Sequence, residues 1–187
     1  MLSRRSFLAH SAGAAIMTQT KLAVAHTNPL WVPPEDHLHE ATIMQWPADR
    51  SVYHDQHFMN NVQQTMAAIT NTISAFEPVI MLADAAAHAH ARKHLSTQVE
   101  LWDIPTNDLW CRDSGPIVAF DATSKRVISH IQFNGWGNKQ VDNHDGKVAE
   151  NMALALDFKR VSTGLIGEAG GVESDAAGTL MAHESSS

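Results

Sequence analysis

Two patterns of apolar residues alternate along the chain: short continuous runs, and stretches in which an apolar residue recurs every three or four positions. Apolar residues dominate positions 41–46 and stop at Pro47, which predicts a short buried strand. Between about Val52 and Phe76, apolar residues recur every three or four positions, the spacing of an amphipathic helix. The stripe consists of Phe58, Val62, Met66, Ile69, Ile73 and Phe76. We expect a long helix that packs through this stripe and ends before Pro78.

In the rest of the chain, short apolar runs continue to alternate with segments whose apolar residues have the spacing of a helix. Strands are predicted at 79–82, 99–104, 117–120, 127–133, 160–163 and 179–182, and helices at 85–95 and about 146–156. Strands that alternate with helices are typical of the α/β class. Because 187 residues suit one globular domain, we expect a single α/β domain after the N-terminal segment.

The N-terminal segment has the features of an export signal. Arg4 and Arg5 precede Ser-Phe-Leu and an apolar stretch that ends near Met17, too short to span a bilayer. This start resembles the twin-arginine signal, and residues 23–25 supply an A-x-A cleavage site. We expect a signal peptide at 1–25, a mature domain at 26–187 and a periplasmic or secreted location. An ordinary secretory signal or a chance basic start is the alternative.

Charge and cysteine content exclude several classes of protein. The chain has 13 Lys and Arg against 20 Asp and Glu, a formal charge of −7, which argues against a nucleic-acid binder and favours a small cationic partner. One cysteine excludes an internal disulfide framework and a multi-cysteine metal site. His90 and His94 are four residues apart on a predicted helix, but Arg92 and Lys93 beside them oppose a cation. We expect a solvated helix face there and no metal site.

One segment, Asp108-Leu-Trp-Cys-Arg-Asp-Ser-Gly-Pro116, concentrates two carboxylates, an indole and a guanidinium. A carboxylate matches the planar donors of a guanidinium ligand, and an indole face attracts the same cation. Trp110 with Asp108 and Asp113 therefore suggests a guanidinium site. The alternative is structural: Arg112 and Asp113 pair with charges of the protein, and Trp110 belongs to the core.

Two later segments add polar and glycine-rich loops. Residues 133–139, Phe-Asn-Gly-Trp-Gly-Asn-Lys, follow a predicted strand, and their glycines suit a functional loop or a tight turn. Residues 168–180 predict a strand, a Gly-Gly bulge, an acidic strand and a hairpin. Neither segment by itself decides between a binding and a structural role.

In their order along the chain, these motifs resemble one family. Trp-x-Arg-Asp-x-Gly-Pro, Phe-Asn-Gly-Trp-Gly, and Glu-x-Gly-Gly leading to Asp-x-x-Gly-Thr-Leu are similar to those of agmatine deiminases and bacterial-type peptidylarginine deiminases. The opening segment 39–47 resembles the first strand of that family. The likeness runs from about Pro33 to the last residue and covers about the first half of the family's domain.

The resemblance implies a fold and a reaction. Family members form the pentein fold, an α/β propeller of five ββαβ-type modules, and hydrolyse a guanidinium group to a ureido group and ammonia without a metal or organic cofactor. A cysteine thiolate attacks the guanidinium carbon, a histidine of a His-x-Asp motif moves protons, and two aspartates hold the substrate nitrogens. Asp113 matches the first of these aspartates, and Trp110 matches the aromatic residue of the pocket. We name Asp108, Asn134 and Trp136 as further substrate-binding candidates.

Other parts of the family's machinery are absent from the sequence. None of the 12 histidines is followed two positions later by aspartate, and the single cysteine, Cys111, occupies the variable position of Trp-x-Arg-Asp. We therefore expect the catalytic histidine and cysteine to lie outside this chain, as in a truncated or split enzyme. About half of a five-module ring leaves an apolar flank, which predicts self-association or pairing with a C-terminal half.

The identity of the substrate stays open at this point. Agmatine, a precursor of putrescine, and the arginine side chain of a peptide both present a guanidinium group, and acidic net charge favours both. The competing hypothesis is a noncatalytic remnant that at most binds guanidinium ligands.

Overall fold

The computed structural model describes residues 30–175 and 177–182. The expected export signal, its cleavage site and the boundary at residue 26 therefore lie outside the described residues. Within the described part, no helix has both the length and the apolar character needed to cross a membrane.

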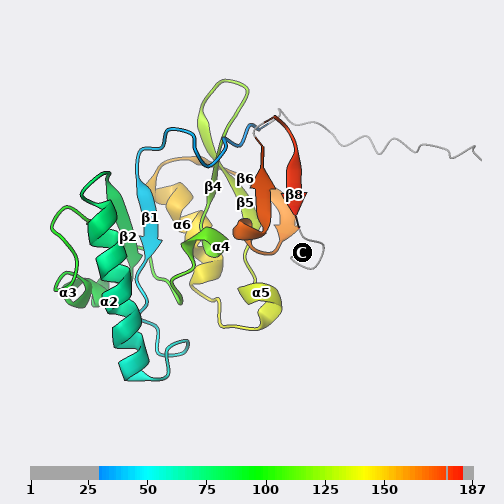
Figure 1. The fold of residues 1–187 in the computed structure, drawn as a ribbon. Helices are drawn as coiled ribbons and strands as arrows, with labels where there is room; N and C mark the ends of the chain where they lie inside the picture. Colours follow the sequence, from blue (N-terminus) through cyan, green and yellow to red (C-terminus); the bar gives the residue numbers. More distant parts are fainter. Residues whose placement is uncertain (1–29, 176, 183–187) are drawn as a thin grey trace, which may run out of the picture.

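Three parallel strands form the first sheet, in the order β1 (Thr42–Gln45), β2 (Val79–Ala83) and β3 (Glu100–Asp103). Helices α2 (Gln56–Ile73) and α3 (Ala85–Ala91) lie on one side of it, and α6 (Val148–Ala155) lies on the other (Figure 1). Helices on both faces explain why β2 is apolar without alternation, as is usual for a parallel strand. These elements confirm the predicted strands and helices, although the helix expected at 85–95 ends at Ala91.

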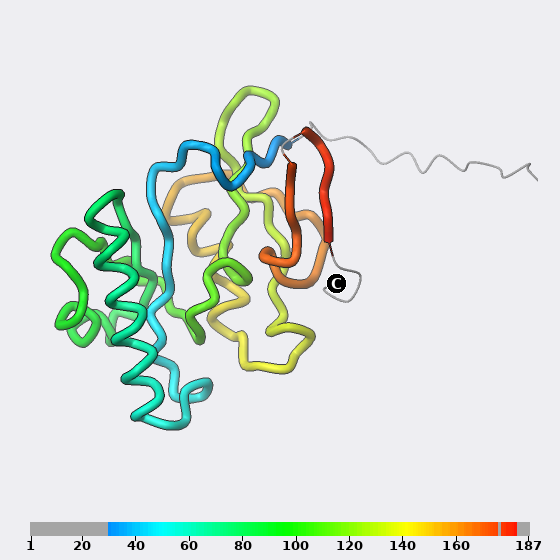
Figure 2. The backbone as a smooth tube through the Cα atoms, viewed as in Figure 1, coloured from blue at the N-terminus to red at the C-terminus, as the bar shows by residue number. Residues whose placement is uncertain are grey.

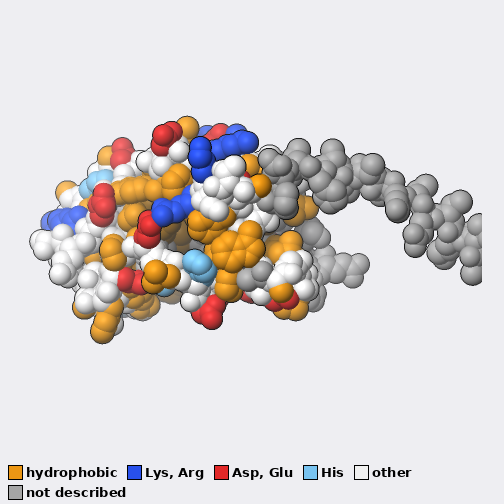
Figure 3. Space-filling model, turned by 90° about the horizontal axis from the view of Figure 1, so that it is seen from above, with side chains coloured by type: hydrophobic (Ala, Val, Ile, Leu, Met, Phe, Trp, Pro, Cys, Tyr) orange, Lys and Arg blue, Asp and Glu red, His pale blue; other side chains and the backbone are white. Residues whose placement is uncertain are grey.

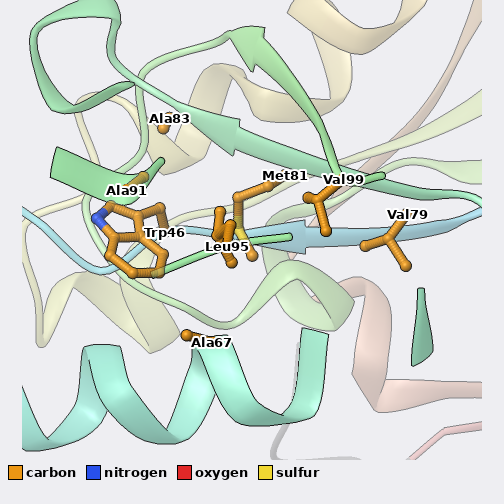
Figure 4. Close-up of a cluster of buried hydrophobic side chains, with 8 residues drawn as sticks. All are labelled: Trp46, Ala67, Val79, Met81, Ala83, Ala91, Leu95 and Val99. Carbon is orange, nitrogen blue, oxygen red and sulfur yellow. The ribbon is translucent and has the colours of Figure 1, made fainter. Parts of the chain in front are cut away.

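Each face of the first sheet has its own apolar cluster. Between the sheet and the helices α2 and α3, the buried residues are Trp46, Ala67, Val79, Met81, Ala83, Ala91, Leu95 and Val99 (Figure 4). On the opposite face, Leu82 and Ile104 pack against Val148 and Met152 of α6. Burial of this kind on both faces, worth about 2 kcal/mol for each large side chain, makes this sheet the core of the molecule.

The long helix exists as predicted, but the face that it buries overlaps the predicted stripe only in part, at Met66 and at the half-buried Val62 and Ile73. Asp55 caps it through a 2.6 Å hydrogen bond from the Phe58 amide. The buried residues of α2 are Met59, Gln63, Met66, Ala67 and Thr70, whereas the predicted stripe members Phe58, Ile69 and Phe76 are exposed. Periodicity predicts a helix, but neighbouring positions lie 100° apart around it, and polar contacts accompany a buried face that is rotated from the predicted stripe. Gln63, for example, donates to the Pro47 carbonyl at 2.7 Å.

The second sheet has the order β4 (Ile117–Phe120), β5 (Arg126–Gln132) and β6 (Lys159–Ile166), with β4–β5 antiparallel and β5–β6 parallel. A separate hairpin joins β7 (Val172–Ser174) and β8 (Leu180–Ala182). The lead-in segment 30–41 crosses this part of the molecule before it enters β1 (Figure 2), and Trp31 exchanges two backbone hydrogen bonds with Phe120. The predicted strands are confirmed here, and β6 is longer than expected.

Short helical turns connect these sheets. They are α4 (Cys111–Ser114), α5 (Gly135–Asn138), η1 (Asp145–Lys147) and η2 (Ala169–Gly171). The sequence predicted loops or a bulge in most of these places, because one turn is too short to show a periodic pattern. The turns α4, α5 and η2 carry the candidate residues and bring them together.

Candidate functional site

Asp113 lies at the contact between α4 and η2. Its Oδ2 atom accepts a 3.1 Å hydrogen bond from Nε1 of Trp136, and its Oδ1 atom lies against Gly170, where a Cβ would approach to 2.2 Å. Glycine at position 170 is therefore what allows the carboxylate to sit there. Burial, reinforced by the nearby charge of Glu168 and opposed by the Trp136 hydrogen bond, raises the pKa of Asp113.

Trp136 reaches Asp113 because its loop forms a turn of left-handed helix. Residues 135–138 have φ values of 62°, 55°, 76° and 61°. Such backbone costs roughly 1–2 kcal/mol at each residue other than glycine, so the surrounding contacts must hold it. The Asn134 side chain does so by accepting a 2.9 Å hydrogen bond from the Gly137 amide. The structure therefore brings Trp136 to Asp113 and uses the Asn134 oxygen to fix the loop.

Asp108 is buried and holds the segment before α4. Its carboxylate accepts hydrogen bonds from the Tyr53 hydroxyl, from the Leu109 amide at 2.7 Å and from Nε2 of Gln140 at 2.7 Å. Burial and the carboxylate of Asp108 raise the pKa of Tyr53, so the phenol remains a donor. These contacts give Asp108 a structural role, and its contact with a substrate stays a prediction.

Asp145 is a buried carboxylate that the sequence did not single out. It accepts hydrogen bonds from the backbone amides of Asn107 and Asp108, at 2.8 Å and 3.0 Å, and from Gln45 of β1 at 3.3 Å. Burial raises its pKa to about 6, against the opposing effect of the two amides. The same Gln45 accepts a 2.7 Å hydrogen bond from the Ser114 hydroxyl at the end of α4. Through its hydrogen bonds with Asp145 and Ser114, Gln45 therefore fixes the loop that carries Asp113 to the first sheet.

The structural alternative for the Trp-x-Arg-Asp motif is confirmed for Arg112 and wrong for Trp110. The Arg112 guanidinium forms internal ion pairs with Glu35 of the lead-in and Glu173 of β7. Trp110 lies outside the core, with 53% of its surface exposed. Arg112 therefore ties α4 to two other segments, while the Asp113 carboxylate accepts a hydrogen bond from Trp136 and the Trp110 indole is half exposed.

Cys111 has the environment of an inert thiol. Burial, and to a smaller extent the charge of Asp145, raises its pKa to about 12. A thiol with this pKa carries almost no thiolate near neutral pH, so it is a poor nucleophile. The cavity of about 470 Å³ that it borders, between the second sheet and the β7–β8 hairpin, is lined mainly by apolar side chains such as Ile117, Ile131 and Leu165.

Among the described residues, no group of three or more His, Cys, Asp or Glu side chains is arranged to hold a metal ion. Asp113, the neighbouring charge of Glu168 and the exposed Trp110 form what we call the Asp113 site. The sequence shows Glu168 only as part of a glycine-rich motif, because its closeness to Asp113 depends on the packing of η2 on α4.

Comparison with known proteins gives a consistent result. Residues 31–187 match the family described as Porphyromonas-type peptidyl-arginine deiminase. A Streptomyces coelicolor protein provisionally named an agmatine deiminase is 30% identical over 152 residues, which cover 80% of this chain and 45% of that protein.

Solved structures share the fold. An agmatine deiminase of Enterococcus faecalis superposes with a TM-score of 0.73 at 22% identity, over 82% of this chain and 43% of that one. A substrate-bound agmatine deiminase variant from C. jejuni gives 0.72 at 21% identity, over 83% and 46%. These likenesses confirm the expected α/β pentein fold. The chain spans less than half the length of these relatives.

Proposed function

Because the chain belongs to the Porphyromonas-type peptidyl-arginine deiminase family, we propose that it forms the guanidinium-binding part of a guanidine deiminase. The ligand is a guanidinium group on an alkyl chain, as in agmatine or in an arginine side chain. The observation that carries this proposal is that Asp113 lies on the turn that Trp110 begins, with the carboxylate held by Trp136 and the indole half exposed.

The chemistry of the Asp113 site supports a flat cation. A guanidinium donates two parallel N–H bonds to a carboxylate, and it stacks on an aromatic face. The added charge of Glu168 increases the attraction for a cation and accounts for part of the raised pKa of Asp113. Arg112 does not compete for this carboxylate, since Glu35 and Glu173 hold its guanidinium.

In the proposed reaction, a thiolate adds to the guanidinium carbon, ammonia leaves with a proton from an acid group, and water releases the ureido product and the thiol. The role of Asp113 is to hold the substrate nitrogens and to balance the positive charge while the thiolate attacks. Since the thiol of Cys111 is held protonated, we propose that the nucleophile and the acid–base histidine come from outside these 187 residues. Pairing with a C-terminal half would complete the site, whereas self-association would only cover the apolar flank.

Binding of agmatine and of N-acetylarginine methylamide, measured by calorimetry on the full chain, tests the proposal. Asp113→Asn removes the charge and keeps the shape, and it should weaken both ligands about 30-fold, the cost of a charge-assisted hydrogen-bonded pair. Asp157→Asn is the matched control, because Asp157 is exposed with a φ of 53°, a conformation that Asn tolerates. Equal affinity for the wild type and Asp113→Asn would sink the proposal.

The pH dependence of guanidinium affinity gives a second test of the Asp113 site. Because burial raises the pKa of Asp113, its carboxylate takes up a proton at a higher pH than an exposed aspartate does. Affinity for a guanidinium should therefore fall on acidification at a pH above the ordinary value of 3.8. A pH-independent affinity down to that value would contradict the role of this carboxylate.

Ammonia release separates binding from turnover. We expect the wild-type chain and Cys111→Ala to be equally inactive without a second polypeptide, since a thiol with a pKa near 12 does not supply the nucleophile. Turnover that Cys111→Ala abolishes would instead make Cys111 the nucleophile.

We also propose that the chain is exported by the twin-arginine route. The paired Arg4 and Arg5 followed by an apolar stretch support this proposal. A reporter protein fused to residues 1–25 should reach the periplasm, and replacement of both arginines by lysine should retain it inside the cell. Export of the double-lysine fusion at the wild-type level would contradict this route.

A further inference from the structure

Arg112 carries a guanidinium group of the chain's own beside the Asp113 site. A Cβ atom placed on Gly170 would lie 2.2 Å from Oδ1 of Asp113 and 3.1 Å from Cγ of Arg112, so the stem of the arginine passes directly alongside the carboxylate. The ligand proposed for the Asp113 site is a guanidinium on an alkyl chain, and the Arg112 side chain is such a group. A competitor for the site is therefore attached next to it.

Covalent attachment makes such a competitor effective. A group held near a site by a short flexible stem acts at an effective concentration in the millimolar range, so it competes with free ligands present at similar concentrations. The guanidinium of Arg112 and that of agmatine offer the Asp113 carboxylate the same planar set of N–H donors. Unless other contacts hold Arg112 away, the chain would fill this site itself.

Two glutamates hold the Arg112 guanidinium away from Asp113. Nη2 of Arg112 lies 2.9 Å from Oε1 of Glu173 on β7, and the same nitrogen forms an ion pair with Glu35 of the lead-in. The pKa of Asp113 agrees with this arrangement, because burial raises it and the opposing charge of Arg112 is too weak to reverse the shift. A guanidinium in direct contact with the carboxylate would lower that pKa instead.

The two ion pairs lie at the surface and come from segments on either side of α4 in the sequence. All three side chains are more than half exposed, so each pair by itself contributes little to stability. Glu35 precedes the first strand, and Glu173 belongs to the β7–β8 hairpin. Loss of one glutamate should therefore leave Arg112 in place, whereas loss of both should release it.

Starting from the proposed guanidinium site, we propose that Glu35 and Glu173 are positioning residues that keep this site open by holding the Arg112 guanidinium outside it. When both carboxylates are lost, the guanidinium turns to Asp113 and blocks guanidinium ligands from solution. The two glutamates act on ligand affinity only through Arg112. The lead-in and the β7–β8 hairpin thereby control access to the site, because displacement of both segments closes it.

Calorimetry with agmatine on the full chain measures this block. The double variant Glu35→Gln/Glu173→Gln keeps the size of both side chains and removes their charges. It should weaken agmatine about tenfold, the effect of an attached competitor that fills the site about nine-tenths of the time. Each single variant should weaken agmatine by no more than about twofold, because the remaining glutamate still holds the guanidinium.

A third substitution shows whether the loss comes from competition. In the triple variant Glu35→Gln/Glu173→Gln/Arg112→Gln the competitor is gone, so the affinity for agmatine should return to about the wild-type level. If the ion pairs only stabilised the fold around α4, the triple variant would bind no better than the double variant, since both lack the same contacts.

A matched double variant controls for the change in net charge. Glu40 and Glu150 also form ion pairs in which every side chain is more than 40% exposed, with Arg126 and Arg160. Glu40→Gln/Glu150→Gln removes the same two negative charges from the chain without releasing Arg112. It should leave the affinity for agmatine unchanged.

The indole N–H signal of Trp136 in a ¹⁵N-labelled chain tests the same step without a ligand. This N–H donates a 3.1 Å hydrogen bond to Oδ2 of Asp113, so the arrival of Arg112 at the carboxylate should shift the signal. The pH at which the signal titrates should also fall, because an adjacent guanidinium lowers the pKa of a carboxyl group. Both changes should appear in the double variant and be absent from the triple variant, and Trp136→Phe identifies the signal among the five tryptophans.

Two outcomes would overturn the inference. One is a double variant with wild-type affinity for agmatine and an unmoved Trp136 signal, since Arg112 would then stay away from Asp113 without the glutamates. The other is a loss of affinity that Arg112→Gln does not restore, which would make the two ion pairs purely structural. Failure of the wild type to bind agmatine would instead count against the proposed function, and the Trp136 signal would still show whether Arg112 moves.

Discussion

The first sheet differs from the second sheet and the β7–β8 hairpin in what covers it. In β2, Val79, Met81 and Leu82 are at most 1% exposed, because helices pack on both faces of the first sheet. In β6 and β8, Leu165 is 56% exposed and Leu180 is 64% exposed. Figure 3 shows that hydrophobic side chains also reach the surface among charged ones on the face seen from above.

The first sheet therefore concerns the stability of the fold, and the second sheet with the β7–β8 hairpin concerns its assembly. The first sheet closes its own apolar surface, so its folding energy comes from contacts inside the described residues. The second sheet and the β7–β8 hairpin leave apolar side chains in solvent, which costs the burial energy that a neighbour would supply. Since the structural relatives are more than twice as long as the aligned part, we propose that these residues pack on a further part of the same fold.

Truncation of one leucine in each sheet should reveal the largest contrast. Leu82→Ala opens a cavity in a fully buried strand and should lower the free energy of unfolding by about 4 kcal/mol. Leu165→Ala, the matched change in β6, should cost at most about 0.5 kcal/mol, because that side chain is already more than half exposed. Urea unfolding of both variants measures the difference, and similar costs would contradict the comparison.

Asp145 offers a pH-dependent test of how the candidate-site loop is fixed to the first sheet. Its pKa is raised to about 6 in the fold, above the ordinary value of 3.8, so its contribution to stability is present below pH 3.8 and is lost as the pH rises through 6. From pH 4 to 7, the unfolding free energy of the wild type should fall by about 2.5 kcal/mol relative to Asp145→Asn. Parallel pH profiles would show that the buried carboxyl has an ordinary pKa.

The left-handed turn after β5 can be probed with two glycines. Gly135→Ala should cost about 2 kcal/mol, because its φ is 62° and its Cβ would lie 2.4 Å from the Gln140 carbonyl oxygen. Gly137→Ala has a similar φ but open space around the Cβ, and it should cost about 1 kcal/mol. Thermal unfolding ranks the pair. Gly135→Ala should also shift the indole N–H signal of Trp136, and a reversed ranking would contradict this geometry.

The smallest effect is expected for a surface ion pair in the second region. Arg160 of β6 lies 3.1 Å from Glu150 of α6, with both side chains more than 40% exposed. Arg160→Ala should therefore change the unfolding free energy by only about 0.5 kcal/mol, and less at high salt. A loss as large as that of Leu82→Ala would mean that this charge pair, rather than apolar burial, holds β6 in place.

Local pattern predicted the secondary structure well because strands and helices differ in period. The strands at 79–82 and 117–120 and the helix at 56–73 follow directly from the spacing of apolar residues. The same spacing could not select the buried face of α2, since Gln63 donates to the Pro47 carbonyl and Thr70 to the Met44 sulfur, contacts with a distant part of the chain. Periodicity therefore gave the helix and its approximate ends, and packing gave its orientation.

The candidate site divides in the same way. Residue chemistry within nine positions was enough to predict Asp113 and Trp110 as candidates, because residues close in sequence are close in space. Asp145 and Gln45 were missed, since each is an ordinary polar residue until the fold removes it from water.

The sequence by itself determined the α/β class, the order of the elements and the motif that holds Asp113, because these depend on local composition and spacing. Only the tertiary structure decided that Arg112 binds Glu35 and Glu173 and that Trp136 binds Asp113. The physical reason is distance: hydrogen bonds and ion pairs act over a few ångströms, and residues far apart along the chain reach that range only after the sheets have packed.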